Sequence, residues 1–277
     1  MNVETVLQYK HPQEDDAIRR LEKHLVNDEY MNQICEMYKT VDEENLLPDM
    51  IGKAVEINEH QMPEVYAIFQ HYCDLLKMKV PKIYSFEGMF VEVNAEGLDK
   101  PWVQIIARTF DICDKKELSF LIARQLIHIK LGHMKHEILC EQFDRTIQIA
   151  QGFGSSFVGF IPGGSKFSEE SFDIFTKKFK LISARWFRVT EYTADRCALA
   201  LTDWDIKTAV SAIKKQIFNS KKLADMVRMS EYLMQTRTIL SLKSPVAKYS
   251  IMDEQCPYGP FRIKELISFA STHCIDK

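Results

Sequence analysis

Three side chains that could take part in chemistry lie in the segment 115–137, KKELSFLIARQLIHIKLGHMKHE. Apolar residues recur there with helical spacing, so the segment predicts a largely buried helix. Arg124 and His128 are four residues apart and share one helical face, with Gln125 beside them. A neutral imidazole binds metals, whereas a guanidinium has no lone pair for a metal and an amide is neither acid nor base. His128 is therefore the only one of the three suited to metal binding.

A second constellation lies in the segment 183–201, SARWFRVTEYTADRCALAL. Glu191 and Asp195 are four residues apart, and Arg188 precedes Glu191 by three, so all three share one helical face. A charged face in contact with solvent is one interpretation. The segment is otherwise largely apolar, which favours a buried polar role. A buried carboxylate needs a cation or a proton, so we expect a partner for Glu191 from another helix.

Taken alone, His128 is typical of a core histidine with satisfied hydrogen bonds. His133 lies five residues further on and points to another side of the helix, and His136 lies near its polar end, so we expect both at the surface. No serine or cysteine triad and no phosphate-binding glycine loop is apparent. Cys113 and Cys197 lie near these segments, and we expect both to be buried and inert.

Several elements must position these side chains. We expect two amphipathic helices in the first fifty residues, ending near Pro48, and a helix at 63–78 with Pro63 in its first turn. Short runs of β-branched and aromatic residues at 80–93 and 102–107 predict a small sheet. The remaining pattern predicts helices at 168–201, 204–219, 221–242 and 260–272.

The segment 146–165, TIQIAQGFGSSFVGFIPGGS, carries only polar and apolar uncharged residues. Twenty such residues could cross a bilayer, but its glycines, serines and glutamines are poor lipid-facing material. We expect a surface-to-core hairpin instead. Its neutral loop is a candidate lid or membrane contact.

Composition excludes several classes of protein. The chain has 277 residues, of which 46% are hydrophobic and 27% charged, as in an ordinary globular protein. The net charge is −3 and the basic residues form no stripe, which argues against nucleic-acid binding. Seven scattered cysteines without a CxxC pair fit a reducing compartment. The first residues have no signal-peptide pattern, so we expect a cytoplasmic protein.

The segment 124–128, RQLIH, aligns with the HExxH motif in which two histidines bind zinc and the glutamate activates a water molecule. Together with 183–201 it resembles the M48 family of zinc metallopeptidases. Further similarity lies, in the order of the family, at 61–66 (QMPEVY), 81–84 (PKIY), 94–95 (NA), 116–118 (KEL), 186–196 (WFRVTEYTADR) and 257–266 (PYGPFRIKEL). The likeness runs over roughly residues 55–270.

The resemblance implies a zincin-like α+β fold, mostly helical, with a small sheet packed on the zinc helix. It implies one folding unit at 55–277 after an N-terminal helical extension at 1–54. His128 and Glu191 take retained zinc-ligand positions, with Arg188 and Asp195 behind them. Arg124 replaces the first histidine and Gln125 replaces the catalytic glutamate. In such peptidases an edge strand holds the substrate, and here 102–107 or 86–92 are the candidates.

These replacements predict a pseudopeptidase. An arginine in place of a ligand adds a positive charge beside the site and leaves two ligands, whereas catalytic zinc usually has three. Loss of a general base commonly costs on the order of 10²–10⁴ in rate. We therefore expect an Arg124–Glu191 ion pair, with His128 as a neutral imidazole beside it. The expected role is binding of a peptide or partner protein, without a cofactor.

Two other functions stay open at this point. One is an active zinc peptidase with an altered metal site built from His128, Glu191 and Asp195. The other is an enzyme that modifies or cyclises peptides in the same cleft.

Overall fold

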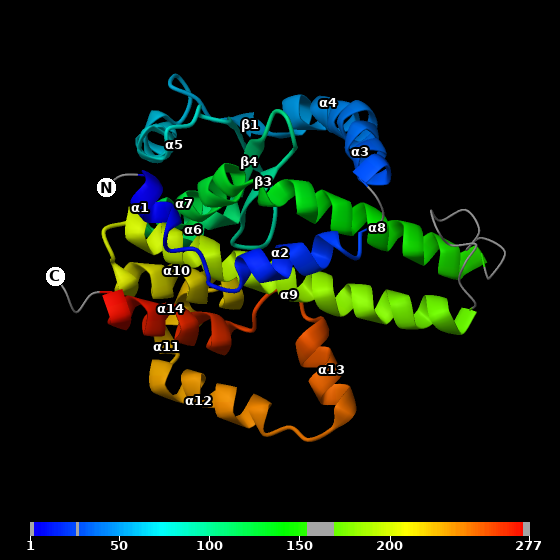
Figure 1. The fold of residues 1–277 in the computed structure, drawn as a ribbon. Helices are drawn as coiled ribbons and strands as arrows, with labels where there is room; N and C mark the ends of the chain where they lie inside the picture. Colours follow the sequence, from blue (N-terminus) through cyan, green and yellow to red (C-terminus); the bar gives the residue numbers. More distant parts are fainter. Residues whose placement is uncertain (1–2, 26–27, 154–168, 274–277) are drawn as a thin grey trace.

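The computed structural model describes residues 3–25, 28–153 and 169–273 (Figure 1). It is an α+β structure, mostly helical, with one small mixed sheet. Its strands are β1 (Val55–Glu56), β2 (Lys82–Phe86), β3 (Val93–Glu96) and β4 (Trp102–Ile106). Its helices are α1 (Val3–Leu7), α2 (Glu14–Glu22), α3 (Asp28–Met37), the π-helical turn η1 (Tyr38–Asp42), α4 (Glu43–Lys53), α5 (Pro63–Leu76), α6 (Arg108–Ile112), α7 (Lys115–Leu131), α8 (His133–Phe153), α9 (Glu169–Leu201), α10 (Ile206–Phe218), α11 (Lys221–Met226), α12 (Met229–Leu240), α13 (Pro245–Asp253) and α14 (Gly259–His273).

Helix α7 lies at the centre of the fold. It packs against α9, α10, α5 and strand β3, and these neighbours surround it in Figure 1. Residues 120–128 of α7 are all buried as a result. The sequence predicted this, since apolar residues cover most of the circumference of the helix.

Both ends of α7 are set by local sequence. Asp114 accepts hydrogen bonds from the backbone N–H groups of Lys116 and Glu117, and Glu117 bonds back to the N–H of Asp114. Gly132 ends the helix with a left-handed φ of 70°, which glycine adopts without strain. The predicted single helix at 115–137 is therefore wrong, because α8 begins anew at His133.

The sheet order β1-β2-β4-β3 places β1 and β3 at the edges. β4 pairs in parallel with β2 and antiparallel with β3, so it is an interior strand. The prediction that 102–107 forms the substrate-holding edge is thus wrong. The other candidate, 86–92, is also wrong, because β2 ends at Phe86 and no strand begins before Val93. β3 is the edge strand that faces α7.

The N-terminal segment packs onto the rest of the described chain. α2 lies along α9, where Leu21 joins Phe143 and Trp186 in a second hydrophobic cluster (Figure 1). The segment holds more helices than the two predicted, and Pro48 lies inside α4 rather than at a helix end. Pro48 is exposed there, where a missing helical hydrogen bond costs least. Pro63 occupies the first turn of α5, as predicted.

The C-terminal helices follow the predicted pattern with two differences. α9, α10 and α14 match the predicted segments closely, but 221–242 contains two helices and α13 was not predicted. α12 contacts α14 and α13 contacts α9, while both project from the lower side of the body in Figure 1. We name residues 229–253 the α12–α13 arm.

The uncharged segment 146–165 is described only in part. Up to Phe153 it continues α8, so the predicted hairpin does not begin at 146. The rest of that prediction lies in 154–168, outside the described residues. No described helix is long and apolar enough to cross a membrane. The six cysteines of the described chain are free thiols.

Candidate functional site

The centre of the candidate site is a group of four charged side chains at the crossing of α7, α9 and α14. Arg124 donates from Nη2 to Glu191 Oε2 and from Nε to Asp195 Oδ1, the latter at 2.5 Å. Arg262 donates to Asp195 from Nε at 2.7 Å and from Nη2 at 2.8 Å. The predicted Arg124–Glu191 pair is present, and it belongs to a larger network with balanced charge.

Burial makes this network strong. Arg124 has 2% of its side chain exposed and Asp195 has 1%, whereas Glu191 is 25% exposed where it borders a cleft. Burial by itself would raise the pKa of Glu191, but the charge of Arg124, followed by that of Arg262, outweighs it and lowers this pKa to about 2. Burial by itself would lower the pKa of Arg262, but the negative charge of Asp195 outweighs it and raises this pKa. Glu191 and Arg262 therefore carry their charges at neutral pH.

His128 lies beside the network as a neutral imidazole, as predicted. Its Nε2 lies 3.5 Å from Glu191 Oε1 and has no hydrogen-bond partner among the described residues. Its Nδ1 lies 3.0 Å from Nδ1 of His133, so one ring donates and the other accepts. Burial, followed by His133, lowers the pKa of His128 to about 3. His128 is therefore a neutral group between a carboxylate and a second imidazole.

The surface position predicted for His133 is wrong. Because Gly132 ends α7, the chain turns and His133 points back into the protein, where it is buried. Its Nε2 lies 3.4 Å from Oε1 of Glu14 in α2, and Thr193 donates a hydrogen bond to the same carboxylate. His136 is also only partly exposed and contacts Glu22. Polar contacts thus run from Glu191 through two imidazoles to the N-terminal segment.

Gln125 forms its hydrogen bond with the sheet rather than with the charged network. Its Oε1 accepts a hydrogen bond of 3.1 Å from the backbone N–H of Ala95 in the edge strand β3. This bond satisfies an edge N–H that no strand partner reaches within the described residues. It also fixes the distance between β3 and α7.

Arg188 does not support Glu191 or Asp195, contrary to prediction. Its guanidinium donates to the carbonyl oxygens of Met252, at 2.8 Å, and Glu254. Arg188 therefore holds the end of α13 against α9. The spacing of three residues places Arg188 and Glu191 on one face of α9. The side chain of Arg188 nevertheless extends toward the end of α13.

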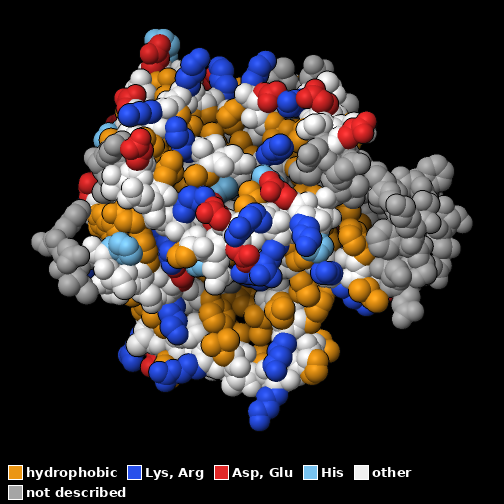
Figure 2. Space-filling model, viewed as in Figure 1, with side chains coloured by type: hydrophobic (Ala, Val, Ile, Leu, Met, Phe, Trp, Pro, Cys, Tyr) orange, Lys and Arg blue, Asp and Glu red, His pale blue; other side chains and the backbone are white. Residues whose placement is uncertain are grey.

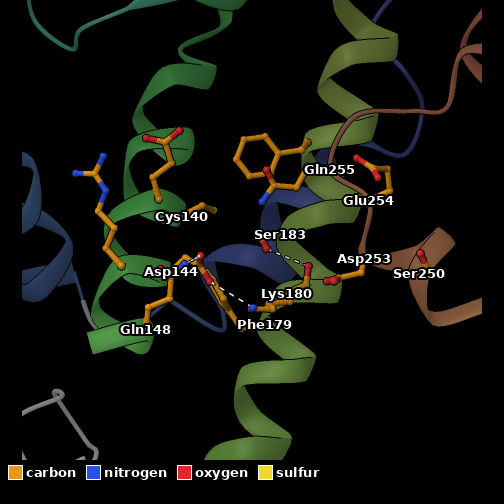
Figure 3. Close-up of a pocket in the computed structure, with 13 residues that line it drawn as sticks. Cys140, Asp144, Gln148, Phe179, Lys180, Ser183, Ser250, Asp253, Glu254 and Gln255 are labelled. Carbon is orange, nitrogen blue, oxygen red and sulfur yellow. Dashed lines mark hydrogen bonds and ion pairs between the residues drawn. The ribbon is translucent and has the colours of Figure 1, made fainter. Parts of the chain in front are cut away.

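A cleft of about 490 Å³ opens above the network. Its lining includes Arg124, Gln125, Glu191 and Arg262 at the floor, with Asn94 of β3 on one wall. A hollow of about 690 Å³ lies beside it between α8, α9 and the chain that follows α13 (Figure 3). The two spaces share Glu141, Phe187 and Gln255 in their linings, so they adjoin.

Carboxyl groups gather beside the cleft: Glu137 and Glu141 line it, and Glu96 lines a small neighbouring pocket together with them. Burial, followed by the charges of Glu141, Glu96 and Glu191, raises the pKa of Glu137 to about 8. Burial, followed by Glu141 and Glu92, raises the pKa of Glu96 to about 7. Burial also raises the pKa of Glu141, although the positive charge of Arg145 opposes this shift. These acids repel one another, so a cation in the cleft would relieve them.

The donor set does not fit a catalytic zinc ion. Glu191 Oε2 and both oxygens of Asp195 already accept guanidinium N–H bonds. Two lone-pair donors are left, His128 Nε2 and Glu191 Oε1, whereas a catalytic zinc needs three protein ligands. Within the described residues, no group of three histidine, cysteine or acidic side chains is arranged to hold a metal.

Sequence reasoning missed several residues of this site. Arg262 was noted only as part of the segment 257–266, and nothing in the local pattern of α14 assigns it to Asp195. Glu14 gave no signal because its partners His133 and Thr193 lie on other elements, and Glu137 gave none because its burial depends on tertiary packing. Searches against protein-family models, curated proteins and solved structures find no match for this chain.

Replacement of Arg124 by methionine tests the network. Methionine preserves much of the apolar volume but leaves Glu191 with only Arg262, whose Nη2 lies 3.8 Å from it. We expect the free energy of unfolding to fall by about 3 kcal/mol, because a buried ion pair loses one partner. The measurement is urea denaturation. Arg108→Met at an exposed pair is the control and should change stability by less than about 0.5 kcal/mol; an equal loss for both variants would contradict the network.

Glu137→Gln tests the carboxyl groups beside the cleft. The pKa of Glu137 is about 8 in the folded protein, against an ordinary value of 4.5. Its ionisation therefore destabilises the folded state increasingly as the pH rises from 4.5 to 8. We expect the variant to be more stable than the wild type at pH 8 and equal to it near pH 4.5, by thermal unfolding across this range. Glu64→Gln, at an exposed site, should show no such trend.

Proposed function

We propose that this chain is a catalytically impaired relative of the M48 zinc metallopeptidases that binds an extended peptide or a partner protein in its cleft. The observation that carries the proposal is that Arg124 joins Glu191 across the α7–α9 crossing. In the family, positions equivalent to 124, 128 and 191 bind zinc together. Here a fixed positive charge stands in place of one ligand and contacts another.

The charge of Arg124 opposes a metal at this position. A guanidinium about 4 Å from a divalent ion repels it by roughly 8 kcal/mol at an effective dielectric constant near 20. Gln125 adds a second obstacle to hydrolysis, since an amide cannot act as a general base and this one is engaged by the N–H of Ala95. Both replacements favour binding over catalysis.

The walls of the cleft indicate what it binds. Asn94 of the edge strand β3 lines the cleft, so an extended chain bound there lies beside this strand, although Gln125 already takes the edge N–H of Ala95. The cations of the floor, Arg124 and Arg262, are already paired, whereas Glu137 and Glu141 repel their neighbours. A peptide with a lysine or arginine side chain therefore suits this cleft better than a neutral or acidic one.

The double variant Arg124→His with Gln125→Glu tests the ancestry of the site. With His128 and Glu191 it restores three ligands and a base, so we expect one zinc ion per chain to survive dialysis. Metal content by mass spectrometry is the measurement. The same variant carrying Glu191→Gln is the control and should lose the metal. A double variant that folds, by circular dichroism, yet holds no zinc contradicts the resemblance.

The wild-type protein supplies the complementary measurement. We expect no stoichiometric zinc after dialysis and no peptide cleavage when zinc is added. Wild-type protein that retains one zinc ion and cleaves peptides until a chelator is added contradicts the proposal and makes the chain an active peptidase.

Fluorescence anisotropy with a labelled decapeptide tests the binding function. A peptide with two arginines among valines should bind more tightly than the same peptide with glutamines in their place. The double variant Glu137→Gln with Glu141→Gln should lower the affinity for the arginine peptide about five- to tenfold, because it removes about 1 kcal/mol or slightly more of electrostatic attraction. Asp225→Asn, at an exposed site, is the control. Equal binding of both peptides contradicts the basic preference, and absence of any binding contradicts peptide capture.

A further inference from the structure

The α12–α13 arm exposes apolar side chains that the body of the protein does not cover. Between residues 240 and 252, five large apolar side chains are exposed, with Leu240 at 68% and Val246 at 78%; the others are Leu242, Tyr249 and Met252. None of the nine residues of α13 is buried. Single exposed apolar residues are ordinary in proteins, but a concentration on one projecting segment marks a contact surface.

The same segment is positively charged. The arm, residues 229–253, carries Arg237, Lys243 and Lys248 against Glu231 and Asp253, so its net charge is +1, and both acids lie at its ends, away from residues 240–249. The chain as a whole has a net charge of −3, so the arm differs in sign from the rest. Figure 2 shows this region at the lower end of the molecule, where orange and blue side chains lie together with few red ones.

The position of these residues favours a flat surface over a peptide or a helix as the occupant. Leu240, Leu242 and Val246 surround the connection between α12 and α13, which is the part of the arm furthest from the body in Figure 1. A projecting end that carries apolar residues between lysines fits the interface of an anionic bilayer. The apolar side chains reach the acyl boundary while the ammonium groups remain among the phosphates.

We propose that residues 240–249, at the end of the α12–α13 arm, dock this protein onto anionic lipid membranes without crossing them. Docking would leave the cleft outside the contact, because its lining comes from α7, α8, α9, α10, α14 and β3, together with residues 90–92 and the chain at 255–256, and includes no residue of 240–249. The inference rests on the arm alone, so it stands whether or not the cleft binds a peptide.

Vesicle sedimentation of the full chain tests the proposal. We expect binding to phosphatidylcholine vesicles that contain about a third phosphatidylserine, weak binding to phosphatidylcholine alone, and a decrease with salt. Lys243→Ala with Lys248→Ala should weaken binding about 25-fold, or about fivefold for each lysine. Leu240→Ser with Val246→Ser should weaken it about tenfold or more.

Two matched controls alter exposed residues elsewhere. Ile51→Ser removes an exposed apolar side chain from α4, and Lys79→Ala removes an exposed lysine between α5 and β2. Both should leave vesicle binding unchanged. Failure to bind anionic vesicles, or binding that the arm variants leave intact, overturns the proposal. A dimer detected by light scattering that the Leu240 and Val246 substitutions abolish also overturns it, and assigns the arm to self-association.

Discussion

The structure depends most on the guanidinium of Arg124, which is buried between two carboxylates. Arg124 comes from α7, its partners Glu191 and Asp195 come from α9, and Arg262 of α14 completes the set. A buried charge is costly unless it is paired and hydrogen-bonded, so each helix must hold its register for the others to stay satisfied. The network thus links three helices that are far apart in the sequence.

This network also determines the electrostatics of the cleft. Its two arginines and two acids balance one another, so the floor offers little net charge to a ligand. Beside this floor lie Glu137 and Glu141, and burial, followed by repulsion from neighbouring carboxylates, raises the pKa of Glu137 to about 8, so that this group is largely protonated at neutral pH until a cation binds nearby. The result is a cleft with a charge-balanced floor beside carboxyl groups whose ionisation a bound cation would favour, next to an edge strand.

The charge distribution gives the molecule two different surfaces. The cleft is lined by paired arginines and by carboxyl groups with raised pKa values, whereas the α12–α13 arm exposes large apolar side chains and has a net charge of +1. The two lie on different elements, and Arg188 connects them, because it belongs to α9 yet holds the carbonyl groups at the end of α13. Arg188 therefore joins the end of the arm to the helix that carries Glu191.

Much of the fold was predictable because its signals are local. The buried character of α7 follows from its apolar residues, and the start of α5 follows from Pro63. The prediction extended α7 past Gly132 because helical periodicity continues through that residue. A glycine in the left-handed conformation ends a helix whatever the hydrophobic pattern does.

The sequence by itself determined which residues share a helical face, since spacings of three and four are fixed by helix geometry. It also indicated that a buried Glu191 needs a cation, and the resemblance to the M48 family pointed to Arg124. Only the tertiary structure decided that Asp195 joins that pair, that Arg262 completes it and that Arg188 does not. Those contacts join elements separated by more than sixty residues, and no local pattern specifies which side chains meet when the helices pack.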